Sequence, residues 1–245
     1  MEDYRGSTRL FHQVEKNSMP TNELNMSDID IRVLRTEALT NDDLKMVHRL
    51  FDLSYHRANH KYLENSFSKL RYIALATSKE TPAGFALADT IETHLPRLAD
   101  PQVIMLAGIC CVASDCRRMG LFTKLEILAA NASGLLKPGI RILMCGRMAH
   151  PVSFRTIRKS PHVIPKYGVP LSDWHKEIGL RVAGLYGVTL DPETFIVKGD
   201  GLPIGYPDLE YEIPEEEWLP FQAVNRDQGD SLLGMTWFPD APEGW

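Results

Sequence analysis

One stretch of the sequence joins an apolar run, a basic turn and the start of a helical pattern. Val103 to Ala113 is continuously apolar, as in a strand covered on both faces, and leads through Arg117 and Arg118 to Gly120. The first turn of a helix has unpaired N–H groups at the positive end of its dipole, which favours a phosphate. Gly120 has no Cβ to obstruct a ligand, and the arginines add charge. The alternative is a plain connection with two solvated arginines.

The loop sequence Arg117-Arg118-Met119-Gly120-Leu121-Phe122 resembles the pyrophosphate loop of the GNAT superfamily of acyl-CoA-dependent N-acyltransferases. The pattern of that family is Arg/Gln-x-x-Gly-x-Gly/Ala, and Phe122 departs from it at the last position. Val112 lies at the distance before Gly120 at which the family has a strand-end Val. The elements expected from Ile29 to about Lys159 follow the family's order, so the resemblance covers roughly half of the chain.

The resemblance implies both a fold and a co-substrate. The fold would be a mixed, mostly antiparallel central sheet flanked by helices, here with a C-terminal extension. The co-substrate would be acetyl-CoA or another acyl-CoA, with no metal. Its pyrophosphate would lie on the loop amides, and its pantetheine arm would run along the preceding strand, in a gap beside the strand at 140–148. The residues expected to bind it are Cys110, Cys111, Val112, Arg117, Arg118, Met119, Gly120, Phe122 and Thr123.

Catalytic residues are less clearly indicated. Attack of an amine on a thioester needs a base for the amine and an acid for the leaving thiolate. Many GNAT enzymes have a Glu at the position of Leu106 and a Tyr near that of Ile157, and neither residue here can serve. The candidates instead are His150, Glu92 and Tyr167, with Asp89 as a further carboxylate.

Each candidate also has a structural interpretation. His150 would cap a helix, Glu92 would be a solvated strand-end carboxylate, and Tyr167 a turn aromatic before a glycine. Cys110 and Cys111 have apolar neighbours, which raise a thiol pKa, so a packing role is expected for them rather than an acyl-enzyme.

The composition excludes several classes of protein. The 245 residues are 44% hydrophobic and 24% charged, which is typical of a globular chain and not of a fibrous or disordered one. The longest apolar run is too short to span a bilayer, and the N-terminus has no pattern of a secretory signal. We therefore expect a cytoplasmic protein with reduced cysteines and no membrane role.

The charges are segregated along the chain. Residues 116–172 contain ten Lys and Arg residues and a single acid, Glu126, whereas residues 208–218 contain six acids and no base. A basic middle in a chain of net charge −5 suggests a specific anionic ligand. The acidic total, and the lack of interleaved aromatic residues, argue against nucleic-acid binding.

Periodicity predicts the elements and their boundaries. Residues 1–28 are expected to be a flexible leader, 29–198 a GNAT-like acyltransferase domain, and 199–245 a Pro-, Gly- and Trp-containing wrap. The expected strands cover 29–35, 71–77, 84–92, 103–113, 140–148 and 194–197. Helices are expected after Thr40, over 62–70, after Gly120, around 153–159 and after Ser172.

The sequence therefore predicts an N-acyltransferase that moves an acyl group from acyl-CoA to a small-molecule amine. Two alternatives remain open. The donor would be an acyl carrier protein if the basic groove binds that protein's acidic surface, and the chain would be a non-catalytic acyl-CoA-binding module if no acid and base are present. The acceptor side is expected from residues 55–62, residues 89–94 and the Trp-rich tail. The sequence leaves the acceptor and the oligomeric state open.

Overall fold

The computed structural model describes residues 25–209 and 211–245. Most of the leader expected over residues 1–28 lies outside this range, and Met26–Asp28 form a 3-10 turn before the first strand. None of the helices in the described part is long and apolar enough to cross a membrane.

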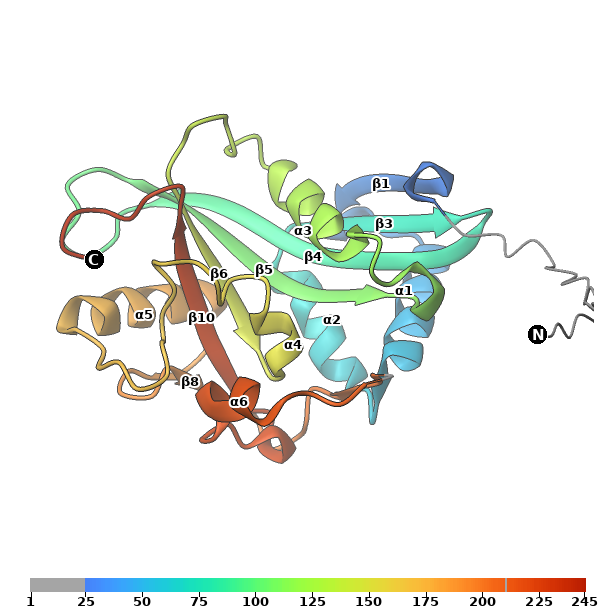
Figure 1. The fold of residues 1–245 in the computed structure, drawn as a ribbon. Helices are drawn as coiled ribbons and strands as arrows, with labels where there is room; N and C mark the ends of the chain where they lie inside the picture. Colours follow the sequence, from blue (N-terminus) through green and yellow to red (C-terminus); the bar gives the residue numbers. More distant parts are fainter. Residues whose placement is uncertain (1–24, 210) are drawn as a thin grey trace, which may run out of the picture.

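The centre of the molecule is one eight-stranded sheet with the order β1-β3-β4-β5-β6-β10-β8-β7 (Figure 1). Neighbouring strands are antiparallel except β5 and β6, which are parallel. The mixed, mostly antiparallel sheet is the expected fold class. The strands are β1 (Ile29–Arg35), β3 (Tyr72–Ser78), β4 (Thr81–Thr93), β5 (Gln102–Val112), β6 (Ile142–Met148), β7 (Leu190–Asp191), β8 (Ile196–Val197) and β10 (Ser231–Phe238).

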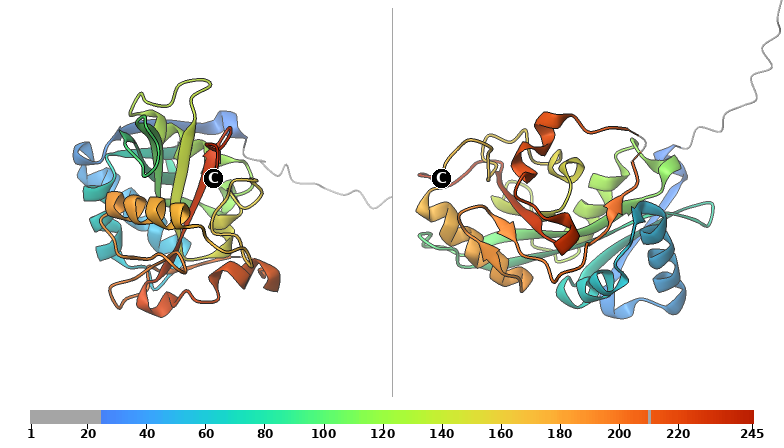
Figure 2. Two further views of the ribbon diagram at one scale, coloured as in Figure 1. Left: turned by 90° about the vertical axis from the view of Figure 1, so that its left-hand side faces the viewer. Right: turned by 90° about the horizontal axis from the view of Figure 1, so that it is seen from below.

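Alternation along the strands produces two cores. Ile73 and Leu75 of β3 point to one face of the sheet, whereas Ala74 and Ala76 point to the other. The first face packs against α1 (Asn41–Ser54), α2 (His60–Lys69) and α5 (Asp173–Tyr186). The second, lined by small alanines, packs against α3 (Leu121–Asn131). Figures 1 and 2 show α3 and the α1, α2, α5 group on opposite sides of the sheet.

Local signals determine where the main helices begin and end. Thr40 caps α1 through a capping box with Asp43, as expected, and Ser172 caps α5. Gly187 ends α5 in the left-handed conformation, with a φ of 63°. The helix expected around 153–159 is shorter and earlier: α4 covers only Pro151–Phe154 and is followed by turns.

The C-terminal part is not only a wrap. β10 lies inside the sheet, between β6 and β8, and pairs with β6 from Leu232↔Met148 to Phe238↔Ile142. The tail expected at 199–245 therefore contributes an internal strand. Residues 199–229, which we call the strap, connect β8 to β10 and contain β9 (Tyr206–Pro207) and α6 (Glu215–Trp218). Figures 1 and 2 show the strap crossing the end of the molecule at which the strands β5 and β6 terminate.

Candidate active site

A gap opens between β5 and β6. The two strands pair from Val103↔Ile142 to Ala107↔Gly146, and beyond this point β5 continues with β4 alone. The register between β4 and β5 shifts between Ala88↔Ala107 and Ala86↔Cys110, so β5 has a bulge at Gly108 and Ile109. A bulge bends its strand, and here it separates β5 from β6. Gly108 is required, because a Cβ there would lie 2.3 Å from Cδ1 of Leu70.

A tyrosine hydroxyl marks the narrow end of the gap. Tyr186, the last residue of α5, is buried, and its hydroxyl lies 2.9 Å from the carbonyl oxygen of Ala107 and 3.0 Å from that of Cys145. The single hydroxyl proton is shared between one carbonyl of β5 and one of β6. Burial raises the pKa of Tyr186 well above its usual value, so it stays protonated and donates.

The loop between β5 and α3 presents a row of backbone amides. Arg118 and Gly120 both have a positive φ, 66° and 78°, and α3 begins directly after Gly120. Within the described chain, the N–H groups of residues 118–123 have no hydrogen-bond acceptor. A Cβ at Gly120 would meet nothing within 4 Å, so the backbone is uncovered at that position. Convergent free amides at a helix start form an anion site.

The two loop arginines differ in what they contact. Arg117 donates from Nε to the carbonyl of Val112 at 3.3 Å and from Nη1 to the carbonyl of Asp208 in the strap at 3.0 Å. It therefore fixes the loop to β5 and to the strap. Arg118 is exposed and takes part in no salt bridge within the described residues. Arg118 is thus the loop arginine available to a ligand.

The first turn of α3 contacts the thiol of Cys110 on β5. Phe122 is half-buried, and its carbonyl lies 3.9 Å from Sγ of Cys110. Burial raises the pKa of the Cys110 thiol well above its usual value and that of Cys111 to about 12. Both are free thiols and poor nucleophiles, as the apolar sequence around them predicts.

Two aromatic residues and an arginine lie on the α1/α2 side of the gap. Tyr55 follows α1, and its phenol has a raised pKa because of burial and the nearby thiols of Cys111 and Cys110. Arg147, one residue beyond the last β5–β6 pair, lies with its Cζ 5.6 Å from the centre of the Tyr62 ring of α2. Residues 55–62, expected on the acceptor side, thus include two of the aromatic residues on this side of the gap.

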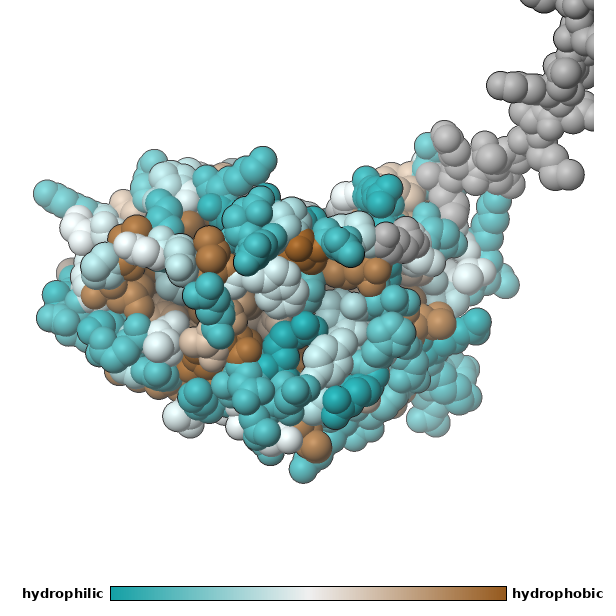
Figure 3. All heavy atoms as spheres, turned by 60° about the horizontal axis from the view of Figure 1, so that its bottom comes forward, coloured by the Kyte–Doolittle hydropathy of each residue, from teal (hydrophilic) through white to brown (hydrophobic). Residues whose placement is uncertain are grey.

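The strap covers the open end of the gap and is attached on both sides. Near α1, β9 pairs with β2 (Tyr55–His56), and Asp208 donates its N–H to the Ser54 carbonyl at 2.9 Å. Near α4, the Glu217 carboxylate, 7% exposed, accepts from Arg155 at 2.6 Å and from Arg158 at 2.9 Å. Part of the basic middle of the sequence thus binds the acidic tail rather than a ligand. Figure 3 shows this face, where hydrophilic side chains predominate and smaller hydrophobic areas lie between them.

His150 has the structural role that the sequence left open. It is buried and is the N-cap of α4, where its Nδ1 accepts the Val152 N–H at 3.2 Å. Its ring contacts Trp218 edge-on, with centroids 4.9 Å apart. Burial, followed by the charges of Arg226 and Arg155, lowers the pKa of His150 to about 4. His150 is therefore neutral at pH 7, with its lone pair occupied by the cap.

The structure does not bring Glu92 and Tyr167 to the gap. Glu92 is exposed and pairs with Val103, so it lies at the opposite end of β5 from Val112, roughly 30 Å away. Tyr167 is exposed in the loop after α4, where it lines a separate cavity of about 180 Å³ with Pro151 and Glu217. The register of β4 against β5 rules out Glu92 as a residue of the gap, and the position of its loop rules out Tyr167. Neither could be read from the residue type alone.

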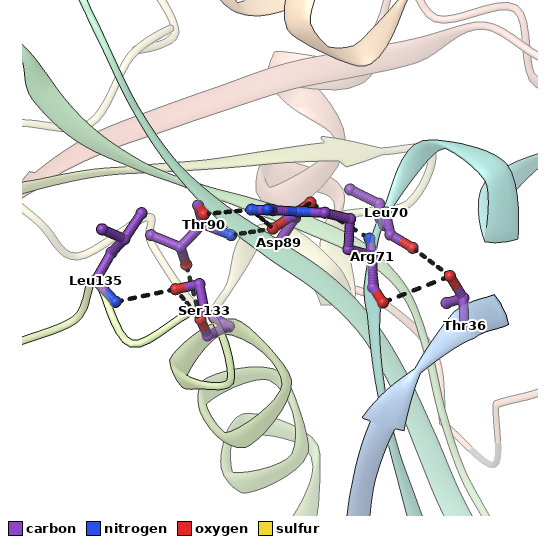
Figure 4. Close-up of polar contacts among 8 residues, drawn as sticks. Thr36, Leu70, Arg71, Asp89, Thr90, Ser133 and Leu135 are labelled. Atoms are coloured by element: carbon purple, nitrogen blue, oxygen red, sulfur yellow. Dashed lines mark hydrogen bonds and ion pairs between the residues drawn. The ribbon is translucent and has the colours of Figure 1, made fainter. Parts of the chain in front are cut away.

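Asp89 is also excluded as a free base, as Figure 4 shows. Its carboxylate accepts from Nε and Nη2 of Arg71, each at 2.7 Å, and from the Thr90 N–H at 2.7 Å. Thr90 in turn donates to the Ala130 carbonyl of α3 at 2.9 Å. Asp89 therefore holds β3, β4 and α3 together.

One titratable group near the gap is absent from the predicted site. Glu126, the single acid of the basic stretch, is half-buried on α3, one turn beyond Phe122, and burial raises its pKa to about 8. Its carboxylate also contributes to the raised pKa of the Cys110 thiol and of the Tyr186 phenol. Its isolation among basic residues was the signal in the sequence that could have identified it.

Comparison with known proteins gives fold similarities only. No family model matches the chain, and no curated protein matches it. A GCN5-related N-acetyltransferase from Kribbella flavida is 14% identical over 54% of this chain, with a TM-score of 0.37, and the match spans 33% of that protein. An aminoglycoside acetyltransferase from an uncultured soil metagenomic sample, in complex with sisomicin, is 12% identical over 60% of this chain and 98% of its own, with a TM-score of 0.37.

A third solved structure is the aminoglycoside N-acetyltransferase AAC(6')-Iy in complex with CoA. It is 19% identical over 52% of this chain and 82% of its own, with a TM-score of 0.36. Of these three structures, one is described as a GCN5-related N-acetyltransferase and two as aminoglycoside acetyltransferases.

Proposed function

We propose that this protein transfers an acyl group from an acyl-CoA thioester to an amine by direct attack. The observation that carries the proposal is the row of amides at residues 118–123, which have no hydrogen-bond acceptor among the described residues and directly follow β5 at the start of α3. Such a row matches the pyrophosphate of CoA, since each N–H is a donor without an acceptor and the helix dipole adds positive potential. The exposed Arg118 adds a full charge beside them.

The gap fits the remaining part of the co-substrate. Beyond Ala107, the β6-facing edge of β5 has no partner strand among the described residues, so its backbone groups, apart from the Val112 carbonyl that accepts from Arg117, can bond an extended amide-containing chain. The pantetheine arm is such a chain, and the thioester it carries supplies the acyl group. In this proposal Cys110, Cys111 and Val112 bind through the backbone and not through their side chains.

Two side chains are proposed for proton transfer. Glu126, with a pKa of about 8, accepts the amine proton, directly or through water, because a base is most effective when its pKa is near the working pH. Tyr55 donates to the leaving thiolate, since its raised pKa keeps the phenol protonated. His150 is not given the role of base, because its pKa of about 4 makes it too weak.

Titration calorimetry with acetyl-CoA and longer acyl-CoAs tests the proposal. We expect Gly120→Glu to abolish binding, because it places a carboxylate among the amides and strains a left-handed position. Gly139→Glu is the matched control, since Gly139 also has a positive φ, 77°, and open space around its Cβ position. The control should bind normally. Absence of binding heat with every acyl-CoA would overturn the proposal. Turnover with an acyl-loaded carrier protein but with no acyl-CoA would mean that the carrier protein is the acyl donor.

A further inference from the structure

Two arginine side chains near the gap have no counter-charge. Arg147 follows the last β5–β6 pair, and Arg226 lies in the strap. Neither takes part in a salt bridge within residues 25–209 and 211–245, and the Nε atom of each is buried without a hydrogen-bond acceptor. A buried N–H without an acceptor is costly, and a guanidinium that loses water usually gains a carboxylate or phosphate. These two arginines therefore lack the partner that their burial requires.

Aromatic rings hold both guanidinium groups from the side. Arg147 lies over Tyr62 at 5.6 Å, and Arg226 lies 4.6 Å from the Tyr206 ring and 5.6 Å from the Trp218 ring. A ring stabilises a guanidinium through its face and leaves the N–H groups at its edge unused. This arrangement orders the cations without neutralising them. The edges are then free to bind a planar anion with two parallel hydrogen bonds.

The electrostatics around the arginines show an excess of positive charge. Partial burial and then the charge of Arg147 lower the pKa of Lys69 in α2, and Asp200 offsets this only in part. Burial lowers the pKa of Arg226, whose charge also lowers the pKa of His150. Arg147 therefore repels the charged Lys69 in the free protein. A bound anion would relieve that repulsion.

We propose that the acceptor is an amine that also carries an anionic group, and that Arg147 binds this group while Arg226 adds to the positive potential. A carboxylate, as in an amino acid, or a phosphate would both fit the fork of Arg147. Because Arg147 directly follows the pair Ala107↔Gly146, an anion bound there lies beside the gap in which the acyl group would react. The inference rests on the proposed function.

Matched acceptors with acetyl-CoA test the inference. The carboxylate set is phenylalanine, glutamate and glycine, each with its amide, and the phosphate set is phosphoethanolamine with ethanolamine. We expect the wild-type enzyme to show a KM about 10-fold or more lower for the anionic member of at least one set. Arg147→Met should raise that KM by roughly 10- to 100-fold and leave the uncharged analogue within about 3-fold. Arg147→Lys keeps the charge and loses the two parallel N–H groups of the guanidinium, so its KM for the anionic acceptor should lie between those of the wild type and Arg147→Met.

Arg97→Met is the control. Arg97 forms an exposed ion pair with Glu177, so its loss removes one surface guanidinium without touching the gap. Equal KM values for the anionic and uncharged acceptors, or an equal loss of both in Arg147→Met, would overturn the inference.

A binding measurement separates this inference from the proposed function. N-acetylphenylalanine and N-acetylphenylalaninamide are titrated into CoA-loaded wild-type and Arg147→Met proteins, which requires no turnover. Preference for the acid in the wild-type protein alone supports a carboxylate site. If CoA binds, the acid is not preferred in this titration, and neither set of acceptors shows a lower KM for its anionic member, the anion site is refuted and the acyltransferase proposal stands. If CoA does not bind the wild-type protein, the proposed function fails instead.

Discussion

The loop at residues 114–123 and the strap at residues 199–229 lie next to one another but use their polar groups in opposite ways. Among residues 25–209 and 211–245, the loop amides 118–123 have no acceptor and Arg118 has no carboxylate partner. Most strap contacts are paired: Glu217 binds two arginines, Asp208 bonds to both Ser54 and Arg117, and Tyr206 donates to Asp227. Unpaired groups indicate where a ligand binds, and paired ones indicate what holds the site in shape.

The comparison also explains the segregation of charge in the sequence. Basic residues that are adjacent along the chain have two different partners. Arg155 and Arg158 close the strap by binding Glu217, whereas Arg118 and Arg147 have no carboxylate partner in the part of the chain that the structure describes. Counting charges by segment therefore overestimates the positive charge available to a ligand. Only the unpaired arginines count towards it.

The largest change in stability is expected in the strap, for Glu217→Gln. Its carboxylate is buried and holds two guanidinium groups that are about one-third exposed. Urea unfolding at pH 7 should show a loss of about 2–3 kcal/mol, at the low end for a broken buried pair because the arginines retain water. We also expect a higher KM for the acceptor, with unchanged CoA affinity, since the strap carries Arg226 and not the loop amides.

The pH dependence has a defined sign. The two arginines, Arg155 first, hold the pKa of Glu217 below its usual 4.5. Its contribution to stability is present above about pH 4.5 and is lost as the pH falls through the lowered pKa. Glu215→Gln on the same short helix is the control, because Glu215 is exposed and takes part in no salt bridge in the described chain. A parallel loss of CoA affinity in Glu217→Gln would mean that the two regions are not independent.

Glu126→Gln should change the free energy of unfolding in the opposite direction from Glu217→Gln, because the carboxylate of Glu126 has no ion-pair partner among the described residues. Burial raises the pKa of Glu126 from 4.5 to about 8, so ionising it destabilises the fold. That destabilisation is absent below about pH 4.5, grows as the pH rises, and is complete above about pH 8. The full shift in pKa would correspond to about 5 kcal/mol of unfolding free energy. Because the half-buried carboxylate keeps some contact with solvent, we expect Glu126→Gln to gain only about 1–3 kcal/mol in stability at pH 9.

Activity and stability should therefore separate in Glu126→Gln. The variant should be more stable than the wild type at pH 9 in urea unfolding and should lose the rise of kcat/KM between pH 6 and 8 that a base with this pKa produces. A residue kept at a cost in stability is typical of a functional site. An unchanged pH–rate profile would remove Glu126 from catalysis and leave it as a buried acid on α3.

Features with local signals were predictable from the sequence. Thr40 with Asp43, Ser172 and Gly187 fix helix ends through contacts within a few residues, and all were identified. The loop at Gly120 was also found, because a strand, a glycine and a helix start are adjacent in the chain. The order of these elements indicated a mixed α/β layout, and the resemblance of the loop at Gly120 implied the mostly antiparallel sheet.

Features that depend on distant pairing were not predictable. β10 pairs with β6, far earlier in the chain, so its apolar residues gave no sign of an internal strand. Glu92 was misplaced because its position depends on the β4–β5 register. Arg147 was missed because the gap beside it follows from a bulge at Gly108 and Ile109, which only the paired strands reveal. Sequence patterns located the loop between β5 and α3 and not the geometry of the gap.

The smallest effect is expected where the two strands of the gap diverge, for Tyr186→Phe. Its hydroxyl lies 2.9 and 3.0 Å from the carbonyls of Ala107 and Cys145, so removing it leaves two buried acceptors without this donor. Thermal unfolding should show a loss of about 1–1.5 kcal/mol, or a Tm lower by roughly 2–5 °C. Tyr167→Phe removes an exposed hydroxyl and should change neither the unfolding free energy nor the Tm.

We expect CoA affinity to fall only a few-fold in Tyr186→Phe, because the bulge and not the hydroxyl separates β5 from β6. A loss as large as that of Gly120→Glu would instead mean that the gap closes without this hydroxyl, and that Tyr186 belongs to the binding site itself.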